Sequence, residues 1–297
     1  MQDFDFAAPT SVEEALKLLQ GVEGEARVLA GGTDLIDQIR RGARRPSLVV
    51  DVKRIPELTA VSRTPDGALR IGAAASCSSL NASELLRGSS WSMLLDATRI
   101  IGDVKIQNRA SLGGNVCNAA PSADGAIPLI CLSAQLVLRS AAGRRELAVE
   151  EFFRGPGETA LQAGEILIEI VVPEAPARSA GSYRRVTPRL EMDIAVAGVG
   201  SFVVLGPEGL VRDCRIGLAA VAPTPLRARS AEAVLRGKVL DGGVMPAVAS
   251  AAAAEARPIS DHRATAGYRR DMVHELTLRT LRDCLARLNG AERSEWP

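Results

Sequence analysis

Histidine is almost absent from this chain of 297 residues, which contains only His262 and His274. Both lie near the C-terminal end of the sequence. Histidine is the usual general base of Ser-His-Asp triads and the commonest side-chain metal ligand. Its scarcity therefore disfavours triad hydrolases and histidine-based metalloenzymes.

Cysteine is sparse too, and its spacing excludes the common metal-binding patterns. The chain has five cysteines, an odd number, and they are far apart. No two of them form the Cys-x-x-Cys pair that zinc and iron–sulfur sites often use. We expect reduced, mostly buried thiols and no metal site on this chain. The five are Cys77, Cys117, Cys131, Cys214 and Cys284.

The sequence lacks an excess of either charge, with 36 Lys plus Arg against 35 Asp plus Glu. Such a balance produces no field that would attract nucleic acid or an anionic membrane. The densest basic cluster has no interleaved aromatic residues for base stacking, so we interpret it as a solvated helix end. We therefore expect no nucleic-acid partner. The cluster consists of Arg40, Arg41, Arg44 and Arg45.

Long hydrophobic runs are missing as well. The most apolar stretch, Ala126 to Leu138, is too short for a bilayer span and contains Pro128, Ser133 and Gln135. The first residues, Met1 to Phe6, lack the basic start and apolar run of a secretory signal. We expect no membrane span and a cytoplasmic location.

What remains is the composition of a soluble globular protein, with 46% apolar and 24% charged residues. The length suits two domains with separate cores. The best linker by composition lies between Pro173 and Ser182, where small and turn-forming residues gather. We place the domain boundary there.

Hydrophobic periodicity predicts mixed helices and strands before the linker and a small sheet backed by helices after it. A capping box at Ser11 and Glu14 predicts the start of the first helix. A glycine-rich loop is expected at 111–115. Further strands are expected at 27–30, 48–52, 69–72, 134–139, 166–172, 195–204 and 214–220, and further helices at 33–42, 80–86, 92–101, 228–235, 245–256 and 261–288.

Glycine pairs occur at Gly31, Gly113 and Gly242, each followed by a second glycine. About two such pairs are expected by chance from this glycine content. Glycine lets a backbone approach a ligand closely, and free amides at a turn or helix start bind phosphate oxygens. The pairs alone therefore leave phosphate binding open. Neither of the first two loops has a GxGxxG or GxxxxGK[ST] pattern, so a Rossmann or nucleoside-triphosphatase fold lacks its motif.

The residues around the first two pairs carry a family resemblance. Val28 to Leu35 (VLAGGTDL) and Asn108 to Asn115 (NRASLGGN) resemble the two FAD-diphosphate loops of the flavoprotein subunit of aerobic carbon monoxide dehydrogenases and xanthine dehydrogenases. The resemblance spans essentially the whole chain. It continues at 120–124, 189–195 and 260–265, and at Tyr268 and Arg269.

The resemblance implies which residues surround FAD, although it implies no catalytic residue and no metal ligand. Ala30 to Thr33, with Ser111 and the residues at 113–115, would surround the diphosphate. Asp34 carries a negative charge, so we expect it to cap the helix or face outward. The full set of implied FAD contacts consists of the two loops, the residues that flank them, and three residues further along the chain. These are Leu29, Ala30, Gly31, Gly32, Thr33, Asp34, Leu35, Ser111, Leu112, Gly113, Gly114, Asn115, Asp124, Tyr183 and Asp193.

The last three of these positions each have a structural alternative. The resemblance places Asp124 at the ribityl hydroxyls, whereas its position before Ala126 to Leu132 also suits a helix cap. Tyr183 would lie by the flavin ring, or would be a half-buried aromatic at a strand edge. Asp193 would lie near the isoalloxazine edge, or would be a structural cap.

The resemblance also implies the fold. The implied protein is α+β, and its FAD-binding domain, of the vanillyl-alcohol-oxidase/PCMH type, would cover 1–177 in two subdomains, about 1–57 and 58–177. A small α+β domain of the carbon monoxide dehydrogenase flavoprotein type would follow at 178–297, with an antiparallel sheet and helices.

The implied function is that of an FAD-binding electron-transfer subunit in a molybdenum hydroxylase. Molybdopterin would lie on a large partner subunit and 2Fe-2S clusters on a small one, in a hetero-oligomer. Two alternatives stay open. One is a free-standing FAD-dependent oxidoreductase that acts on a small molecule, and the other is a non-catalytic assembly scaffold.

Overall fold

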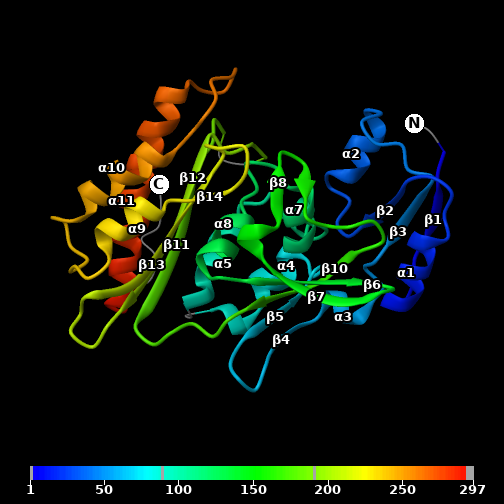
Figure 1. The fold of residues 1–297 in the computed structure, drawn as a ribbon, viewed down its shortest axis with the longest axis horizontal. Helices are drawn as coiled ribbons and strands as arrows, with labels where there is room; N and C mark the ends of the chain where they lie inside the picture. Colours follow the sequence, from blue (N-terminus) through cyan, green and yellow to red (C-terminus); the bar gives the residue numbers. More distant parts are fainter. Residues whose placement is uncertain (1–2, 88–89, 190–191, 292–297) are drawn as a thin grey trace.

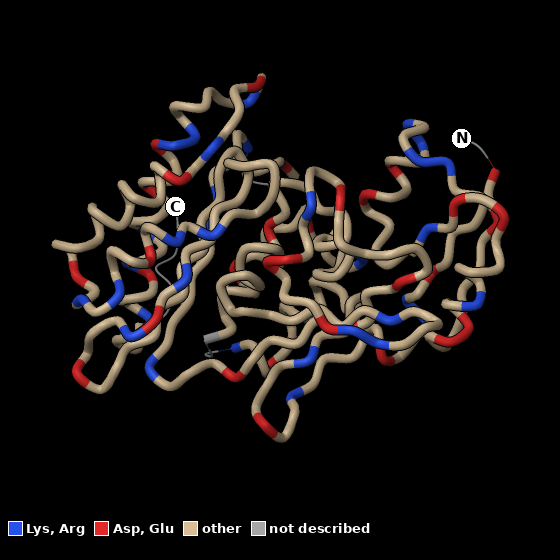
Figure 2. The backbone as a smooth tube through the Cα atoms, in the orientation of Figure 1, with Lys and Arg blue, Asp and Glu red and all other residues tan. Residues whose placement is uncertain are grey.

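The computed structural model describes residues 3–87, 90–189 and 192–291, which form three lobes side by side (Figure 1). Lys and Arg alternate with Asp and Glu over all three lobes (Figure 2), as the balanced composition leads one to expect. None of the helices in these ranges is both long enough and apolar enough to cross a bilayer.

The first lobe is a small parallel sheet in the strand order β1-β3-β2. Alternate residues of its central strand face opposite sides: Leu48 and Val50 pack with α1, and Val49 packs with α2. The predicted helix start is confirmed, because Ser11 Oγ accepts the Glu14 N–H, whereas the Glu14 side chain accepts the N–H of Thr10, one residue before the N-cap. The elements are β1 (Asp5–Ala7), α1 (Val12–Gln20), β2 (Ala26–Leu29), α2 (Leu35–Arg40) and β3 (Leu48–Asp51).

The second lobe is built on an antiparallel sheet in the order β4-β5-β10-β6-β7. Helices α4, α5 and α8 lie between this sheet and the third lobe, whereas α3 lies toward the first lobe (Figure 1). The strands are β4 (Val61–Arg63), β5 (Leu69–Gly72), β6 (Gln135–Ser140), β7 (Gly143–Ala148) and β10 (Ile166–Val172), with a hairpin of β8 (Phe153–Gly155) and β9 (Glu158–Thr159). The helices are α3 (Pro56–Thr59), α4 (Cys77–Ala82), α5 (Met93–Thr98), α6 (Val104–Gln107), α7 (Leu112–Asn118) and α8 (Ala126–Cys131), with 3₁₀ turns at Glu84–Leu86, Ser90–Ser92 and Val149–Glu151.

The third lobe is the expected antiparallel sheet with helices, in the order β11-β12-β13-β14. One face packs on its own helices and the other on α8 of the second lobe. Gly200 and Gly217 make that second contact possible, since a Cβ at either would lie within 3 Å of Ile127. The elements are β11 (Ser179–Val186), β12 (Ala197–Leu205), β13 (Val211–Ala219), β14 (Leu226–Arg227), α9 (Arg229–Leu235), α10 (Met245–Glu255) and α11 (Ala266–Leu288).

Strand β11 joins the third lobe to the second. Asp96 of α5 accepts the N–H of Tyr183 at 3.1 Å and pairs with Arg287 of α11 at 3.0 Å. The same guanidinium donates to the carbonyl of Gly181. Groups on the edge of the sheet are thus satisfied by a buried ion pair, which also closes the edge to other strands.

Three sequence-based expectations need correction. The expected loop at 111–115 is the start of α7, because Ser111 caps a helix that the glycines had concealed. The linker predicted between Pro173 and Ser182 is wrong in its second half, because β11 begins at Ser179. The last helix begins at Ala266 and not at Asp261, because Thr265 caps it by accepting the N–H of Tyr268.

Candidate functional site

The two glycine loops meet backbone to backbone. A Cβ at Gly31 would lie 2.6 Å from the carbonyl oxygen of Arg109 and 2.8 Å from Cα of Ala110. Real Cβ atoms do not approach other atoms so closely, so only glycine permits this contact. The loop that leaves β2 in the first lobe therefore touches the segment that enters α7 in the second.

The second glycine of the first loop turns the chain. Gly32 has φ +76°, in the left-handed region, between the end of β2 and the start of α2. Asp34 follows at the N-cap position, where its side chain makes no capping hydrogen bond and is exposed. Capping by the Asp34 side chain is therefore wrong, and its outward orientation, away from the ligand, stays a prediction.

The two glycines of α7 differ in their surroundings. A Cβ at Gly113 would lie 2.7 Å from Cα of Ala73, so this glycine allows α7 to pack against the second lobe. A Cβ at Gly114 would meet only Ser111 Oγ at 3.1 Å and the Ala30 Cβ at 4.0 Å. Gly114 therefore faces open space between the two loops.

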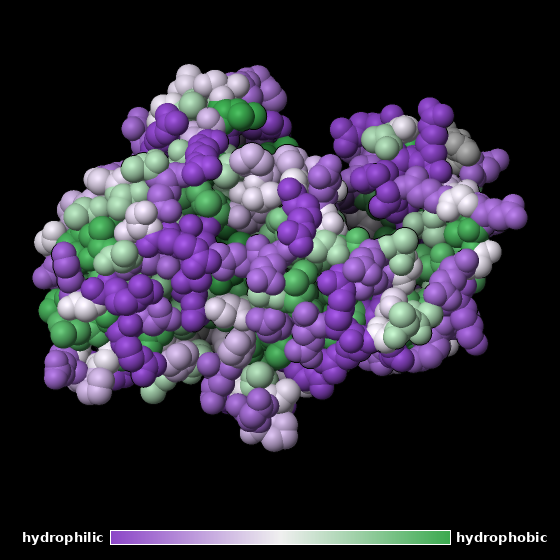
Figure 3. All heavy atoms as spheres, in the orientation of Figure 1, coloured by the Kyte–Doolittle hydropathy of each residue, from purple (hydrophilic) through white to green (hydrophobic). Residues whose placement is uncertain are grey.

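This open space suits a phosphate group. The molecular surface is hollowed beside the lobe that carries α2, next to the region of α7 (Figure 3). Ser111 Oγ accepts the N–H of Gly114 at 3.1 Å and fixes the first turn of α7. That bond occupies the Gly114 amide, and the other amides of the first turn, which have no partner within the helix, can bind anions. The side chains of Leu112 and Leu29 are buried, so only their backbones can contribute.

Asp124 lies at the junction of the second and third lobes. Its Oδ1 accepts the Tyr183 hydroxyl at 2.7 Å, and its Oδ2 is paired with Arg185. Burial raises the pKa of the Asp124 carboxyl, whereas the charge of Arg185 and the hydrogen bond from Tyr183 lower it. Gly125 occupies the N-cap of α8 and no side chain caps that helix. The helix-cap alternative for Asp124 is therefore wrong, and its contact with ribityl hydroxyls stays a prediction.

Asn115 connects the glycine loops to this junction. Its Oδ1 accepts the N–H of Gly125 at 2.9 Å, directly beside Asp124. Arg185 donates a second hydrogen bond to the carbonyl of Ile100 at 2.7 Å. Arg185 was missed in the sequence, where its only signal is its position two residues after Tyr183 on the same strand.

Tyr183 is fully buried, not half-buried as the structural alternative supposed. Its ring has no exposed surface in this conformation, and its hydroxyl is directed at Asp124. Burial raises its pKa well above the usual value, so the hydroxyl remains a donor. Contact of Tyr183 with the flavin stays a prediction.

Asp193 stabilises the turn between β11 and β12. Its carboxylate accepts the N–H of Ile194 at 2.8 Å and the N–H of Arg189 at 3.2 Å. The hydrogen bond from Ile194 holds its pKa below the usual value. This is the role expected of a structural cap, and contact with the isoalloxazine edge stays a prediction. Leu190 and Glu191 belong to the segment 189–195, which is part of the family resemblance, and they lie outside the described residues.

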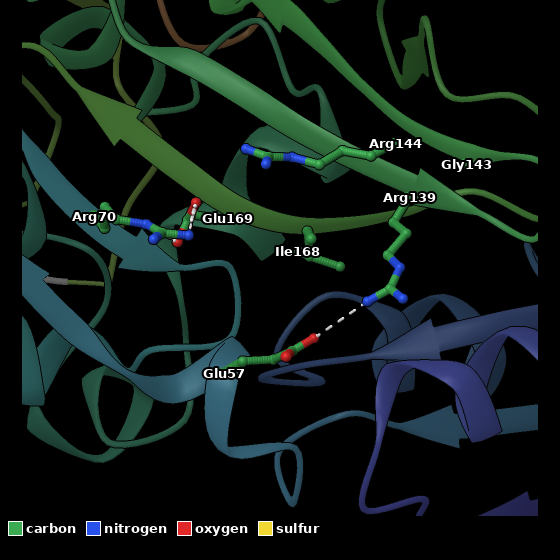
Figure 4. A pocket seen from close by; sticks show the side chains of 7 residues that line it. All are labelled: Glu57, Arg70, Arg139, Gly143, Arg144, Ile168 and Glu169. Carbon is green, nitrogen blue, oxygen red and sulfur yellow. Dashed lines mark hydrogen bonds and ion pairs between the residues drawn. The ribbon is translucent and has the colours of Figure 1, made fainter. Parts of the chain in front are cut away.

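A separate pocket lies on the five-stranded sheet, away from the glycine loops (Figure 4). It has a volume of about 460 Å³, and none of the loop residues lines it. Its charges are paired: Arg70 contacts Glu169 at 2.7 Å, and Arg139 lies 3.9 Å from Glu57. Its chemistry gives no reason to prefer it as a cofactor site.

The five cysteines are free thiols, and four of them are buried. Burial raises the pKa of Cys77 and of Cys131 to about 12, so both stay protonated at neutral pH. Within the ranges that the structure describes, no three His, Cys, Asp or Glu side chains are grouped so that they could hold a metal ion.

Comparison with known proteins identifies two families in the chain. Residues 2–175 match the FAD binding domain in molybdopterin dehydrogenase. Residues 182–284 match the carbon monoxide dehydrogenase flavoprotein C-terminal domain. The chain is 32% identical to the glyceraldehyde dehydrogenase medium chain of Sulfolobus acidocaldarius, over 95% of this chain and 98% of that one. It is 31% identical to a putative xanthine dehydrogenase FAD-binding subunit of Escherichia coli, over 97% and 99%.

Solved structures agree with these matches. A carbon monoxide dehydrogenase chain from Hydrogenophaga pseudoflava superposes with a TM-score of 0.91 at 32% identity, covering 96% of this chain and 98% of that one. A chain of quinoline 2-oxidoreductase from Pseudomonas putida superposes with a TM-score of 0.88 at 25% identity, covering 98% of each. The α+β fold implied by the sequence is confirmed.

Replacing Tyr183 with Phe tests whether this residue has a structural role or contacts the flavin. We expect the free energy of unfolding to fall by about 1–2 kcal/mol, because Asp124 loses a buried hydrogen-bond donor. The flavin absorption bands should stay in place, since the ring has no exposed surface. Chemical denaturation and the absorption spectrum of Tyr183→Phe measure both. Tyr268→Phe is the control, because Tyr268 is 46% exposed; shifted flavin bands in Tyr183→Phe alone would contradict the structural role.

Proposed function

Because the chain belongs to the family of FAD-binding subunits of molybdenum hydroxylases, we propose that it is the electron relay of such an assembly. It receives electrons from iron–sulfur clusters on a partner subunit and passes them through FAD to an external acceptor. FAD supplies the redox chemistry, and the protein contributes binding, orientation and electrostatics.

The observation that carries the proposal is the open space at Gly114, between two loops whose backbones touch at Gly31. The diphosphate lies there, held by the amides of the Ala30–Thr33 loop and of the first turn of α7. Ser111 keeps that turn in place through its hydrogen bond to Gly114. Asp124 takes the ribityl hydroxyls, because each carboxylate oxygen can accept a further hydrogen bond beside those from Tyr183 and Arg185.

The relay role is supported by what the relatives have in common. Relatives of similar identity are named for different substrates: glyceraldehyde, xanthine and carbon monoxide. A chain shared by such different enzymes performs the step that they share, so the substrate is recognised on another chain. We assign molybdopterin to a large partner subunit and the 2Fe-2S clusters to a small one, since this sequence has no Cys-x-x-Cys pair that could help to ligate a cluster.

We also propose the domain division at about residue 177, with the FAD-binding domain divided further at about residue 57. The break between β10 and β11 supports the first boundary, and the change from the parallel to the antiparallel sheet supports the second. FAD then lies between the two subdomains.

Substitution of Gly114 tests the cofactor site. We expect Gly114→Val to lower FAD affinity by about tenfold or more, because the side chain would occupy the space of the diphosphate. The fold should survive, since a Cβ there would approach only the Ser111 Oγ, at 3.1 Å, and the Ala30 Cβ, at 4.0 Å. The flavin-to-protein absorbance ratio of the purified protein and the circular dichroism spectrum measure the two effects.

Gly242→Val is the matched control, because Gly242 also begins a glycine pair and a Cβ there meets nothing within 4 Å. Wild-type flavin content in a folded Gly114→Val would refute the site. Gly32→Val should also lose FAD, but it adds backbone strain because of the positive φ of Gly32. Gly114 is therefore the cleaner test.

The relay itself is tested by anaerobic reduction. We expect the flavin band of this chain to bleach when the reduced iron–sulfur partner subunit is added. The chain alone should not be reduced by aldehydes, purines or N-heterocycles. Turnover of any of these by the isolated chain would support the free-standing oxidoreductase, and an assembly without flavin would support the scaffold.

A further inference from the structure

Two neighbouring strands of the first lobe reach the second lobe at equivalent positions. Leu29 of β2 pairs with Asp51 of β3 in the parallel sheet. Two residues beyond Leu29, Gly31 touches the backbone of Arg109 and Ala110. Two residues beyond Asp51, Lys53 donates from Nζ to the carbonyl of Ala74 at 2.7 Å. The ammonium group of Lys53 is thus held at the same junction as the first glycine loop.

The two contact points belong to one connected structure. The N–H of Cys77 donates to the carbonyl of Ala110 at 2.8 Å, which links the segment that follows Ala74 to the second glycine loop. Lys53 is half-buried there and Arg109 is exposed at the rim. Loss of solvent lowers the pKa of Lys53, and the positive charge of Arg109 lowers it further. The two cations therefore repel each other across the junction.

Within the described part of the chain neither cation has an ion-pair partner, and the charge of Asp51 offsets the lowered pKa of Lys53 only in part. Asp51 is the nearest acidic neighbour of Lys53 in the sequence, and its Oδ1 accepts the backbone N–H of Lys53 at 2.9 Å. A half-buried cation that forms no ion pair costs free energy, which an anion bound at the junction would recover. The open space at Gly114 lies between the same two loops.

We propose that Lys53 and Arg109 are the counter-charges of the FAD diphosphate and make the site selective for a phosphate-bearing flavin. The proposal rests on the proposed function, and it adds two side chains to a site otherwise made of backbone amides. Lys53 is the half-buried cation of this pair and Arg109 is the exposed one. Because Lys53 is shielded from solvent, its contribution exceeds that of Arg109.

The test is a titration of flavin-free protein with FAD and, separately, with riboflavin. Quenching of the flavin fluorescence measures binding in both titrations. We expect Lys53→Met to weaken FAD binding by about tenfold to a hundredfold, and Arg109→Gln by about threefold. Lys53→Arg should keep most of the affinity, because it keeps the charge. Riboflavin, which has no phosphate, should bind all the variants as it binds the wild type.

Salt supplies a second measurement that does not require riboflavin to bind tightly. The FAD affinity of the wild type should fall as ionic strength rises, and each neutral variant should show a shallower dependence. Lys238→Met is the control for a general change in net charge, since Lys238 is exposed on the third lobe. It should behave as the wild type in both measurements.

The outcomes separate this proposal from the proposed function. Wild-type protein that binds no FAD would refute the function itself. FAD binding that is unchanged in Lys53→Met and Arg109→Gln would overturn only the assignment of the two cations. Equal losses for FAD and riboflavin would also overturn it, because they would indicate a general distortion of the junction. Wild-type stability of Arg109→Gln in the flavin-free state would show that its lost affinity is not a loss of folding.

Discussion

The contact between the backbone of Gly31 and that of Arg109 and Ala110 is the constraint on which the cofactor site depends. The two loops come from different sheets, so no local rule brings them together. A side chain at Gly31 would separate them and widen the space beside Gly114. The second glycine of each pair has a different role, since Gly32 turns the chain and Gly114 leaves room for the ligand.

A second set of contacts fixes the third lobe to this site. Along β11, the backbone of Tyr183 is held by Asp96 and its hydroxyl by Asp124, so one residue contacts both α5 and the segment before α8. Arg185 and Arg287 balance the charges of these two buried carboxylates. Removing one partner of such a pair leaves a buried charge without compensation, which makes the junction sensitive to single substitutions.

Local signals made part of the fold predictable from the sequence. The capping box at Ser11 and the apolar strand at 69–72 depend on neighbouring residues alone, and both were predicted correctly. The start of α7 was not, because two glycines have low helix propensity and conceal the cap that Ser111 provides. Asp124 was interpreted as a possible helix cap because its true partner, Tyr183, lies 59 residues further along the chain.

The residues of the site could be predicted only where they belong to the sequence motifs that resemble the family. These motifs indicated the positions of both glycine loops. They did not indicate that Gly31 and Gly113 serve packing whereas Gly114 faces open space. Nor could they identify Lys53, whose side chain reaches the junction only because β2 and β3 end side by side. Such contacts depend on tertiary structure, which local patterns in a single sequence do not contain.

The central claim is that one diphosphate lies between the Ala30–Thr33 loop and the first turn of α7. An experimental structure of the chain with FAD, alone or within its assembly, tests this most directly. The account predicts diphosphate density beside Gly114, within hydrogen-bonding reach of the amides of both loops. Diphosphate density elsewhere, for example in the pocket lined by Arg70 and Arg139 (Figure 4), would contradict it.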